Sequence, residues 1–399
     1  MVPEPTLAAR PLARAIAGAG ALALAMGVGR FAYTALLPSV QRGTGFDDAA
    51  AGAVASLNLV GYLAGVLWAR GAVAGPRRTA LLRLGLAASV LTTAAVAGAT
   101  GLAGWIALRF VSGVASGLVF VLVSAAVLEA LPAGREHLAG VLYAGVGCGI
   151  ALSGAVAAGT AGVGWPVPWL LLGAVSAALA VPAWRQARPA GRTTGAKPTS
   201  AAGDGVSPGR LGAAYFLEGL GYIVSGTFAV AAVQRRPELA AWAPWVWVAA
   251  GLAAAPSAVL WSVMARRVGP RKALVAAFGA QAVGMSLPAL SSSAWAALAG
   301  ALLFGGTFIG ITTLTMSLGR ALHPGREGRV VGTLTMIYGI GQALGPFLAG
   351  MLSRATGGPG AAVLAASVAV GVGGVLLASP SRSRRSTAAV IPQEERCRT

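Results

Sequence analysis

Two charged residues lie inside long apolar runs of this sequence. Arg30 is in AIAGAGALALAMGVGRFAYTALLPSV, and Glu218 is in RLGAAYFLEGLGYIVSGTFAVAAVQ. A charge at the centre of a bilayer costs about 2.5 to 3.5 kcal/mol, so such residues usually face a protein interior or a water-filled cavity and mark a transport path. A guanidinium there can bind an anion. A carboxyl group can carry a proton, because burial favours its neutral form and a nearby cation favours its charged form.

We expect a conformational change that moves Arg30 relative to Glu218 to load and unload this proton. The alternative is a permanent structural ion pair between the two side chains, or a satisfied hydrogen bond between helices. Other polar residues share a helix face with these charges, at spacings of three or four, or interrupt other apolar runs. They can donate hydrogen bonds to a substrate, and the alternative is that they join helices to one another. The predicted substrate-binding residues are Arg30, Tyr33, Asn58, Tyr62, Tyr222 and Gln342.

The composition indicates that these residues belong to a membrane protein. Of 399 residues, 56% are hydrophobic and 10% are charged, and the mean hydropathy is +0.74. These proportions exclude a soluble globule with a charged surface. Runs of about 20 apolar residues recur along the chain, and helices of that length cross a bilayer while satisfying their own backbone hydrogen bonds. The predicted fold class is an all-α membrane protein.

We predict twelve transmembrane helices. Basic residues gather at the amino terminus, in the loops after spans two and eight, and in two polar segments near the middle and the end of the chain. Short cytoplasmic loops carry an excess of Lys and Arg, so both termini are predicted to be cytoplasmic. The predicted spans are 15–41, 48–69, 77–98, 101–128, 138–161, 166–184, 211–234, 242–265, 273–290, 295–318, 330–353 and 361–379.

The two halves of the chain resemble each other. The matched pairs are Gly27 with Gly219, Gly75 with Gly269, Trp105 with Trp295 and Gly147 with Gly339, at offsets of 190 to 194 residues. A nearly constant offset predicts two pseudo-symmetric six-helix bundles in the same orientation. The segment between them is polar and rich in Gly, Pro, Ser and Thr, which is typical of a flexible linker. We predict an N-terminal bundle at 1–184, a cytoplasmic linker at 185–209, a C-terminal bundle at 210–379 and a disordered, basic cytoplasmic tail at 380–399.

Several classes of protein are disfavoured. The net charge of +19 comes from basic residues scattered between the apolar runs, whereas a nucleic-acid binder masses them on one surface. The sequence has no H-E-x-x-H, G-x-S-x-G or phosphate-binding G-x-x-x-x-G-K-[ST] pattern, so we expect no metal site, no cofactor and no enzymatic activity. Cys148 and Cys397 provide no disulfide framework. The first apolar run is also open to interpretation as a signal peptide, although its length exceeds an ordinary one.

The whole chain resembles the major facilitator superfamily of transporters in its six-plus-six spans and in the basic turns after spans two and eight. The segments GVGRFAYTALLP, NLVGYLAG and YFLEGLGYIVSGTF resemble the YbfB/YjiJ branch of bacterial transporters. Arg109-Phe-Val-Ser-Gly113 resembles the span-four motif whose arginine is linked to proton coupling, which implies that role for Arg109 beside Glu218. The alternative is that Arg109 braces backbone carbonyls of its neighbours.

The resemblance also implies a gating motif in the basic loops. Residues 65–78 and 265–272 resemble the superfamily's loop motif, in which basic residues meet helix ends and interdomain acids during gating. Ala69 and Ala265 stand where that motif often has Asp. The implied gating residues are Arg70, Arg77, Arg78, Arg266, Arg267 and Arg271.

These features predict a proton-coupled secondary transporter of a bacterial inner membrane. An excess of cavity arginines over acids favours uptake of a small organic anion together with protons. The alternatives are proton-driven efflux of amphipathic compounds and a non-transporting sensor or scaffold. The expected partners are a small-molecule substrate, protons and the lipid bilayer, with no nucleic acid, and we expect a monomer.

Overall fold

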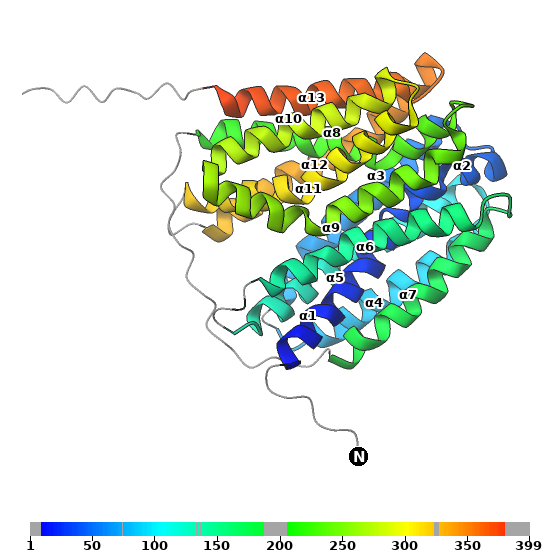
Figure 1. The fold of residues 1–399 in the computed structure, drawn as a ribbon. Helices are drawn as coiled ribbons and strands as arrows, with labels where there is room; N and C mark the ends of the chain where they lie inside the picture. The colour runs from blue at the N-terminus through cyan, green and yellow to red at the C-terminus, as the bar shows by residue number, and fades with distance from the viewer. Residues whose placement is uncertain are drawn as a thin grey trace, which may run out of the picture.

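A computed structural model describes residues 9–73, 75–132, 135, 137–186, 206–322 and 327–379. These residues form helices and connecting turns, without a strand (Figure 1). The helices are α1 (Ala9–Leu22), η1 (Ala23–Val28), α2 (Ala32–Thr44), α3 (Asp48–Ala72), α4 (Arg78–Ala95), η2 (Val96–Gly98), α5 (Gly101–Glu129), α6 (Leu138–Gly159), α7 (Pro166–Gln186), α8 (Pro208–Gln234), η3 (Ala240–Trp242), α9 (Ala243–Val268), α10 (Pro270–Leu290), α11 (Ala294–Ala321), α12 (Glu327–Thr356) and α13 (Gly360–Ala378).

Within the described ranges, twelve helical segments are long and apolar enough to cross a membrane. They coincide with the twelve predicted spans to within a few residues at each end, which confirms the predicted fold class. Most of the predicted linker, residues 187–205, and the whole predicted tail, 380–399, lie outside the described residues. The domain boundaries therefore stay predictions.

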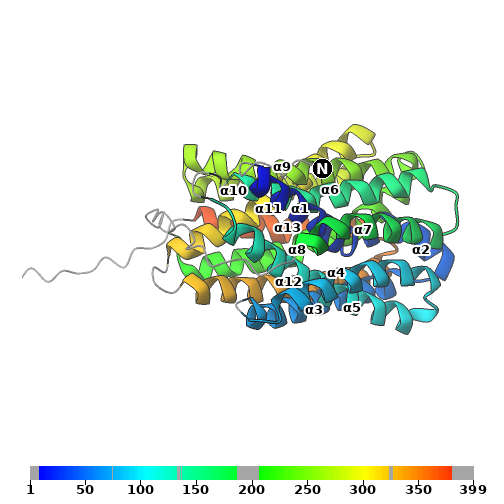
Figure 2. The same cartoon turned by 90° about the horizontal axis from the view of Figure 1, so that it is seen from below.

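The helices of the two halves meet along two long pairs. In Figure 1, α8 and α10 to α13 lie in the upper part of the molecule and α1, α4, α5 and α7 in the lower part. Figure 2 shows α6 beside α9 along one edge and α3 beside α12 along the other, and both pairs are in extensive contact. Small residues allow this approach: at Gly52 an added Cβ would overlap the backbone of Pro346, and at Gly147 that of Gly251. In lipid the hydrophobic effect does not drive helices together, so close backbone packing of this kind stabilises the contact between the two halves.

Equivalent residues of the two halves touch each other where α2 meets α8. Arg30 Nη2 donates a hydrogen bond of 3.0 Å to the hydroxyl of Tyr222, and the Thr34 hydroxyl donates to the carbonyl of Gly226. Both pairs are separated by 192 residues, the offset that the repeat predicts. Residues related by a two-fold axis meet only on that axis, so the pseudo-symmetry axis passes between α2 and α8.

The first span differs from the prediction, which had one continuous helix over 15–41. The chain instead forms wide π-helical turns in η1 and a turn at residues 29–31 before α2 begins. The amide of Thr34 bonds the carbonyl of Phe31, so the carbonyl of Arg30 lacks its usual helical partner. π-helical turns within a helix often mark functional sites, and these turns place Arg30 at the break in the first span.

Candidate functional site

Arg30 lies at the interface of the two halves and is 6% exposed. Besides its hydrogen bond to Tyr222, its guanidinium lies over the ring of Tyr62 at 4.6 Å and over the ring of Phe31 at 5.1 Å. Gln342 Nε2 donates a second hydrogen bond, of 2.7 Å, to the Tyr222 hydroxyl. Four of the predicted substrate residues therefore come together from α3, α8, α12 and the break in the first span.

A series of parallel aromatic rings extends from Tyr222 into the C-terminal half. Phe308 stacks on Tyr222 with ring centres 5.6 Å apart, and Phe304 stacks on Phe308 at 5.7 Å. On the other side, Tyr338 stacks on Tyr222 at 5.6 Å and on Tyr215 at 4.2 Å. The sequence analysis did not select Phe304, Phe308, Tyr338 or Tyr215. The four-residue spacing of the two phenylalanines on one helix was the available signal.

Arg109 supports the broken segment from behind. Its Nη1 and Nη2 atoms donate to the carbonyls of Gly29 and Arg30 at 2.6 and 2.9 Å. Ser112 adds a hydrogen bond of 3.1 Å to the Gly29 carbonyl, and Asn58 donates to the carbonyl of Arg109 at 2.7 Å. These are the carbonyl-bracing and helix-joining contacts that formed the alternative interpretation of Arg109 and Asn58. In this arrangement both residues position Arg30.

Tyr33 lies apart from the Tyr222 cluster. Its hydroxyl donates to the carbonyl of Ala51 at 3.2 Å, and its ring packs against Trp105 inside the N-terminal half. The guanidinium of Arg109 lies over this ring at 5.3 Å. Tyr33 is therefore not part of the Tyr222 cluster, although it lines a small pocket together with Arg30 and Asn58.

Glu218 is fully buried within the C-terminal half. Gln281 Nε2 donates to its Oε1 atom at 2.8 Å, and the Thr307 hydroxyl donates to Gln281 Oε1 at 3.0 Å. The other carboxyl oxygen, Oε2, has no hydrogen-bond partner among the described residues. No described ion pair joins Glu218 to Arg30. The bond from Gln281 is instead a hydrogen bond between α10 and α8, which was the other alternative for Glu218. Gln281 was missed, although it is the one amide in the apolar run ALVAAFGAQAVGMSLPAL.

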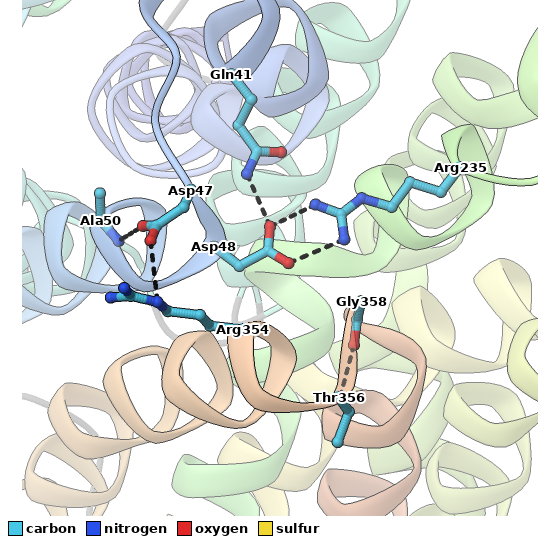
Figure 3. A network of polar contacts seen from close by, with 8 residues as sticks. All are labelled: Gln41, Asp47, Asp48, Ala50, Arg235, Arg354, Thr356 and Gly358. Carbon is cyan, nitrogen blue, oxygen red and sulfur yellow. Dashed lines mark hydrogen bonds and ion pairs between the residues drawn. The ribbon is translucent and has the colours of Figure 1, made fainter.

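Four charged residues connect the two halves at the ends of α3, α8 and α12 (Figure 3). Asp48 accepts hydrogen bonds from both Nη atoms of Arg235, at 2.9 and 2.6 Å, and from Gln41 at 2.8 Å. Arg354 lies 3.5 Å from Asp47. We call Asp47, Asp48, Arg235 and Arg354 the outer latch, because the distribution of basic residues predicts that this end faces away from the cytoplasm.

The sequence analysis did not select the outer latch. The available signal was the pairing of two adjacent acids with two of the few basic residues of the predicted outer loops. At the opposite end, Arg78 forms an ion pair of 2.7 Å with Glu129, and Arg271 donates to the carbonyls of Leu377 and Ala378 at the end of α13. Both contacts stay within one half.

Among the other predicted gating residues, Arg70 reaches across the interface, since its guanidinium lies against Gly332 of α12. The remaining three, Arg77, Arg266 and Arg267, are exposed.

The comparisons with known proteins agree with this architecture. No curated protein sequence matched the chain. Among solved structures, the nucleoside transporter NupG, solved as a point mutant, superposes with a TM-score of 0.70 at 14% identity, covering 91% of this chain and 98% of its own. A bacterial homologue of the human lysosomal transporter Spinster, in an inward-facing and occupied conformation, gives a TM-score of 0.69 at 15% identity, covering 94% of this chain and 97% of its own.

At this level of identity the two solved structures show the shared fold alone. The family follows from the sequence itself, because a family model described as "Uncharacterised MFS-type transporter YbfB" matches residues 22–378. The chain therefore belongs to the YbfB-type branch of the major facilitator superfamily, and it is a secondary transporter of a small molecule.

Proposed function

We propose that the protein takes up a small organic anion together with protons, by alternating access between its two bundles. The observation that carries this proposal is the environment of Arg30. It is buried at the interface of the halves, and neither it nor Arg109 has a carboxylate within ion-pair distance among the described residues. A buried positive charge without a counter-ion favours an anionic ligand over a cationic one.

The proposed substrate site consists of Arg30 with Tyr62, Tyr222 and Gln342. The two tyrosines that contact Arg30 belong to different bundles, since Tyr62 is on α3 and Tyr222 is on α8. An anion bound by the guanidinium is therefore contacted by both bundles at once. Rocking of one bundle against the other changes these contacts while the substrate stays near the centre.

The proposed proton carrier is Glu218. It lies four residues before Tyr222 on α8, so both side chains project from one face of the helix. A change in the charge of Glu218 therefore acts on the phenol that holds Arg30. Arg109 contributes by positioning Arg30, and both termini belong to the cytoplasmic side in this proposal, as the basic loops favour.

Uptake into proteoliposomes with an imposed pH gradient tests the proposal. A panel of radiolabelled small carboxylates is compared for the unaltered protein, Arg30→Ala and Glu218→Gln, with Arg42→Ala and Glu238→Gln as matched controls because both residues are exposed. We expect Arg30→Ala to abolish uptake and Glu218→Gln to abolish its dependence on the gradient. Undiminished, gradient-driven uptake in both variants would exclude these roles.

Efflux of amphipathic compounds is the second candidate, and the stacked rings of Tyr222, Phe308 and Phe304 favour it, because flat apolar groups bind to such faces. The direction of transport separates the two candidates. Expression of the protein in cells raises the accumulation of a substrate that is taken up and lowers the accumulation of one that is exported.

A further inference from the structure

The C-terminal half contains a cavity of about 220 Å³ between α8, α9, α10, α11 and α13. At the outer end it is lined by Arg235 and the turn at residues 357–360. From there it extends between the helices to Ser225, Met285 and Phe304. This cavity is separate from the interface between the two halves.

The repeat explains why the cavity exists. At the 192-residue offset, Tyr33 of the N-terminal half corresponds to Ser225, and Leu37 corresponds to Ala229. Trp105 corresponds to Ala297, which is fully buried as Trp105 is, whereas Trp295, the match made from sequence, is 79% exposed. In the N-terminal half, Trp105 packs against the rings of Tyr33, Trp165 and Trp169. Small residues in the C-terminal half leave this volume open.

The inner end of the cavity lies near Glu218, Gln281 and Thr307, which we call the Glu218 cluster. Its floor is built by the same three helices that carry the Glu218 cluster: Ser225 follows Glu218 by seven residues on α8, Met285 follows Gln281 by four on α10, and Phe304 precedes Thr307 by three on α11. At about 1.5 Å of helix rise per residue, these offsets correspond to roughly one to two turns. On all three helices the cavity is on the outer side of the cluster.

Polar groups at the floor favour water over an empty space. Ser225 lines the cavity, is 3% exposed, and its hydroxyl has no hydrogen-bond partner among the described residues. Glu218 Oε2, further in and outside the cavity lining, also has no described hydrogen-bond partner. Buried polar atoms of this kind are normally satisfied by protein or by ordered water. Since a water molecule occupies about 30 Å³ of liquid, the cavity has room for several.

We propose that this cavity is the route by which the coupling proton reaches Glu218 from the outside, separate from the substrate path between the bundles. The proton passes from hydronium in the cavity to Glu218 Oε2 and leaves water behind. This inference rests on the proposed function, in which Glu218 carries the proton.

Among the described residues, no basic side chain acts electrostatically on Glu218. The titratable side chains that act on it electrostatically are Tyr215 and Tyr222 on its own helix and Tyr338 on α12. Helices α10 and α11 present the neutral Gln281 and Thr307, and α13 has no titratable side chain.

Phe304 links the cavity lining to the proposed substrate site. Its ring lines the cavity and stacks on Phe308, which stacks on Tyr222, the residue that accepts a hydrogen bond from Arg30.

Cysteine accessibility tests whether the cavity is open to water from outside. Cys148 and Cys397 are replaced by serine, and Ala229→Cys is compared with Ala365→Cys, which lies on the exposed face of α13 at a similar distance from the outer loops. The probe is the membrane-impermeant anion 2-sulfonatoethyl methanethiosulfonate, added outside intact cells. We expect modification at residue 229 and none at residue 365, because thiols in lipid do not form the reactive thiolate. A residue 229 thiol that stays unmodified would overturn the proposal.

Labelling of Glu218 by dicyclohexylcarbodiimide, which reacts with protonated carboxyl groups, tests the proton route itself. In vesicles with the inside held at constant pH, labelling of the α8 peptide, read by mass spectrometry, is expected to increase as the external pH is lowered. The double variant Ala229→Leu and Ala232→Leu fills the cavity and removes this dependence, whereas Ala365→Leu retains it. Labelling that follows only the internal pH refutes the route even if Glu218→Gln abolishes coupling. Retained coupling in Glu218→Gln refutes the proposed function and with it the coupling role of the route, even if labelling of Glu218 in the unaltered protein follows the external pH.

Discussion

Neutralising Asp48 in the outer latch is expected to shift the protein toward the conformation that is open to the outside. Asp48→Asn keeps the shape of the side chain and removes the charge that holds Arg235 and Gln41. In the structure this contact joins the ends of α3 and α8, so it exists only while the two halves are closed at this end (Figure 3). Loss of this contact therefore destabilises only the conformation that is closed at this end.

The size of the shift follows from the burial of the pair. A hydrogen bond to a charged group contributes about 1.5 to 3 kcal/mol, whereas an exposed ion pair contributes about 0 to 1 kcal/mol. Asp48 is 5% exposed and the Arg235 side chain is 42% exposed, so the pair lies between these limits. We expect a loss of about 2 kcal/mol, and at tenfold per 1.4 kcal/mol the ratio of outward-open to closed protein rises roughly 25-fold.

Electron paramagnetic resonance distances across the outer end measure this ratio. Spin labels at Val163 and Leu290, both exposed and in different halves, report the separation of the bundles after Cys148 and Cys397 are replaced by serine. Asp48→Asn is expected to increase the population at longer distances. Glu238→Gln, an exposed acid of a neighbouring outer loop, is the control and is expected to change nothing. An unchanged distribution in a folded Asp48→Asn protein would show that the outer latch does not hold the halves together.

Three further outcomes are expected, two at the central site and one where α6 meets α9. Arg109→Ala removes the Arg109 donors from the carbonyls of Gly29 and Arg30 and leaves the Gly29 carbonyl with Ser112 alone, so thermal unfolding in detergent occurs at lower temperature and uptake is lost, while Arg109→Lys retains part of both. Tyr222→Phe removes the hydroxyl shared by Arg30 and Gln342 and weakens substrate binding by about 1 to 3 kcal/mol, measured as a rise in the half-saturating concentration for uptake. Gly147→Leu collides with the backbone of Gly251 and separates α6 from α9, which stops transport without preventing membrane insertion, as membrane levels on immunoblots will show.

The sequence was sufficient to predict the spans, because bilayer thickness dictates a long apolar run for each of them. It was also sufficient to find the buried charges Arg30 and Glu218, which stand out against their apolar neighbours. The equivalence of the halves was readable from glycine spacing, and the contact between Arg30 and Tyr222 confirms the offset of 192 residues.

The break in the first span was not predictable from hydropathy, because η1 is as apolar as the helix around it and the carbonyls of Gly29 and Arg30 in the turn that follows accept hydrogen bonds from a side chain of α5. The partners of the buried charges were missed for a related reason. Gln281 and Thr307 contact Glu218 or each other only through helix packing, and no local pattern links α8, α10 and α11. The match of Trp105 with Trp295 failed because it compared residue types instead of burial.

The contact between Arg30 and Tyr222 also bears on how such a protein can arise from a duplicated six-helix unit. In a dimer of identical copies, a residue on the two-fold axis faces its own copy, so an arginine would meet an arginine. Two guanidinium groups in contact repel each other in a membrane interior. Once the copies are joined in one gene, each copy can change on its own, and an arginine on one side can meet a phenol on the other. The proposed central anion site is therefore available to a joined chain and closed to a symmetric dimer.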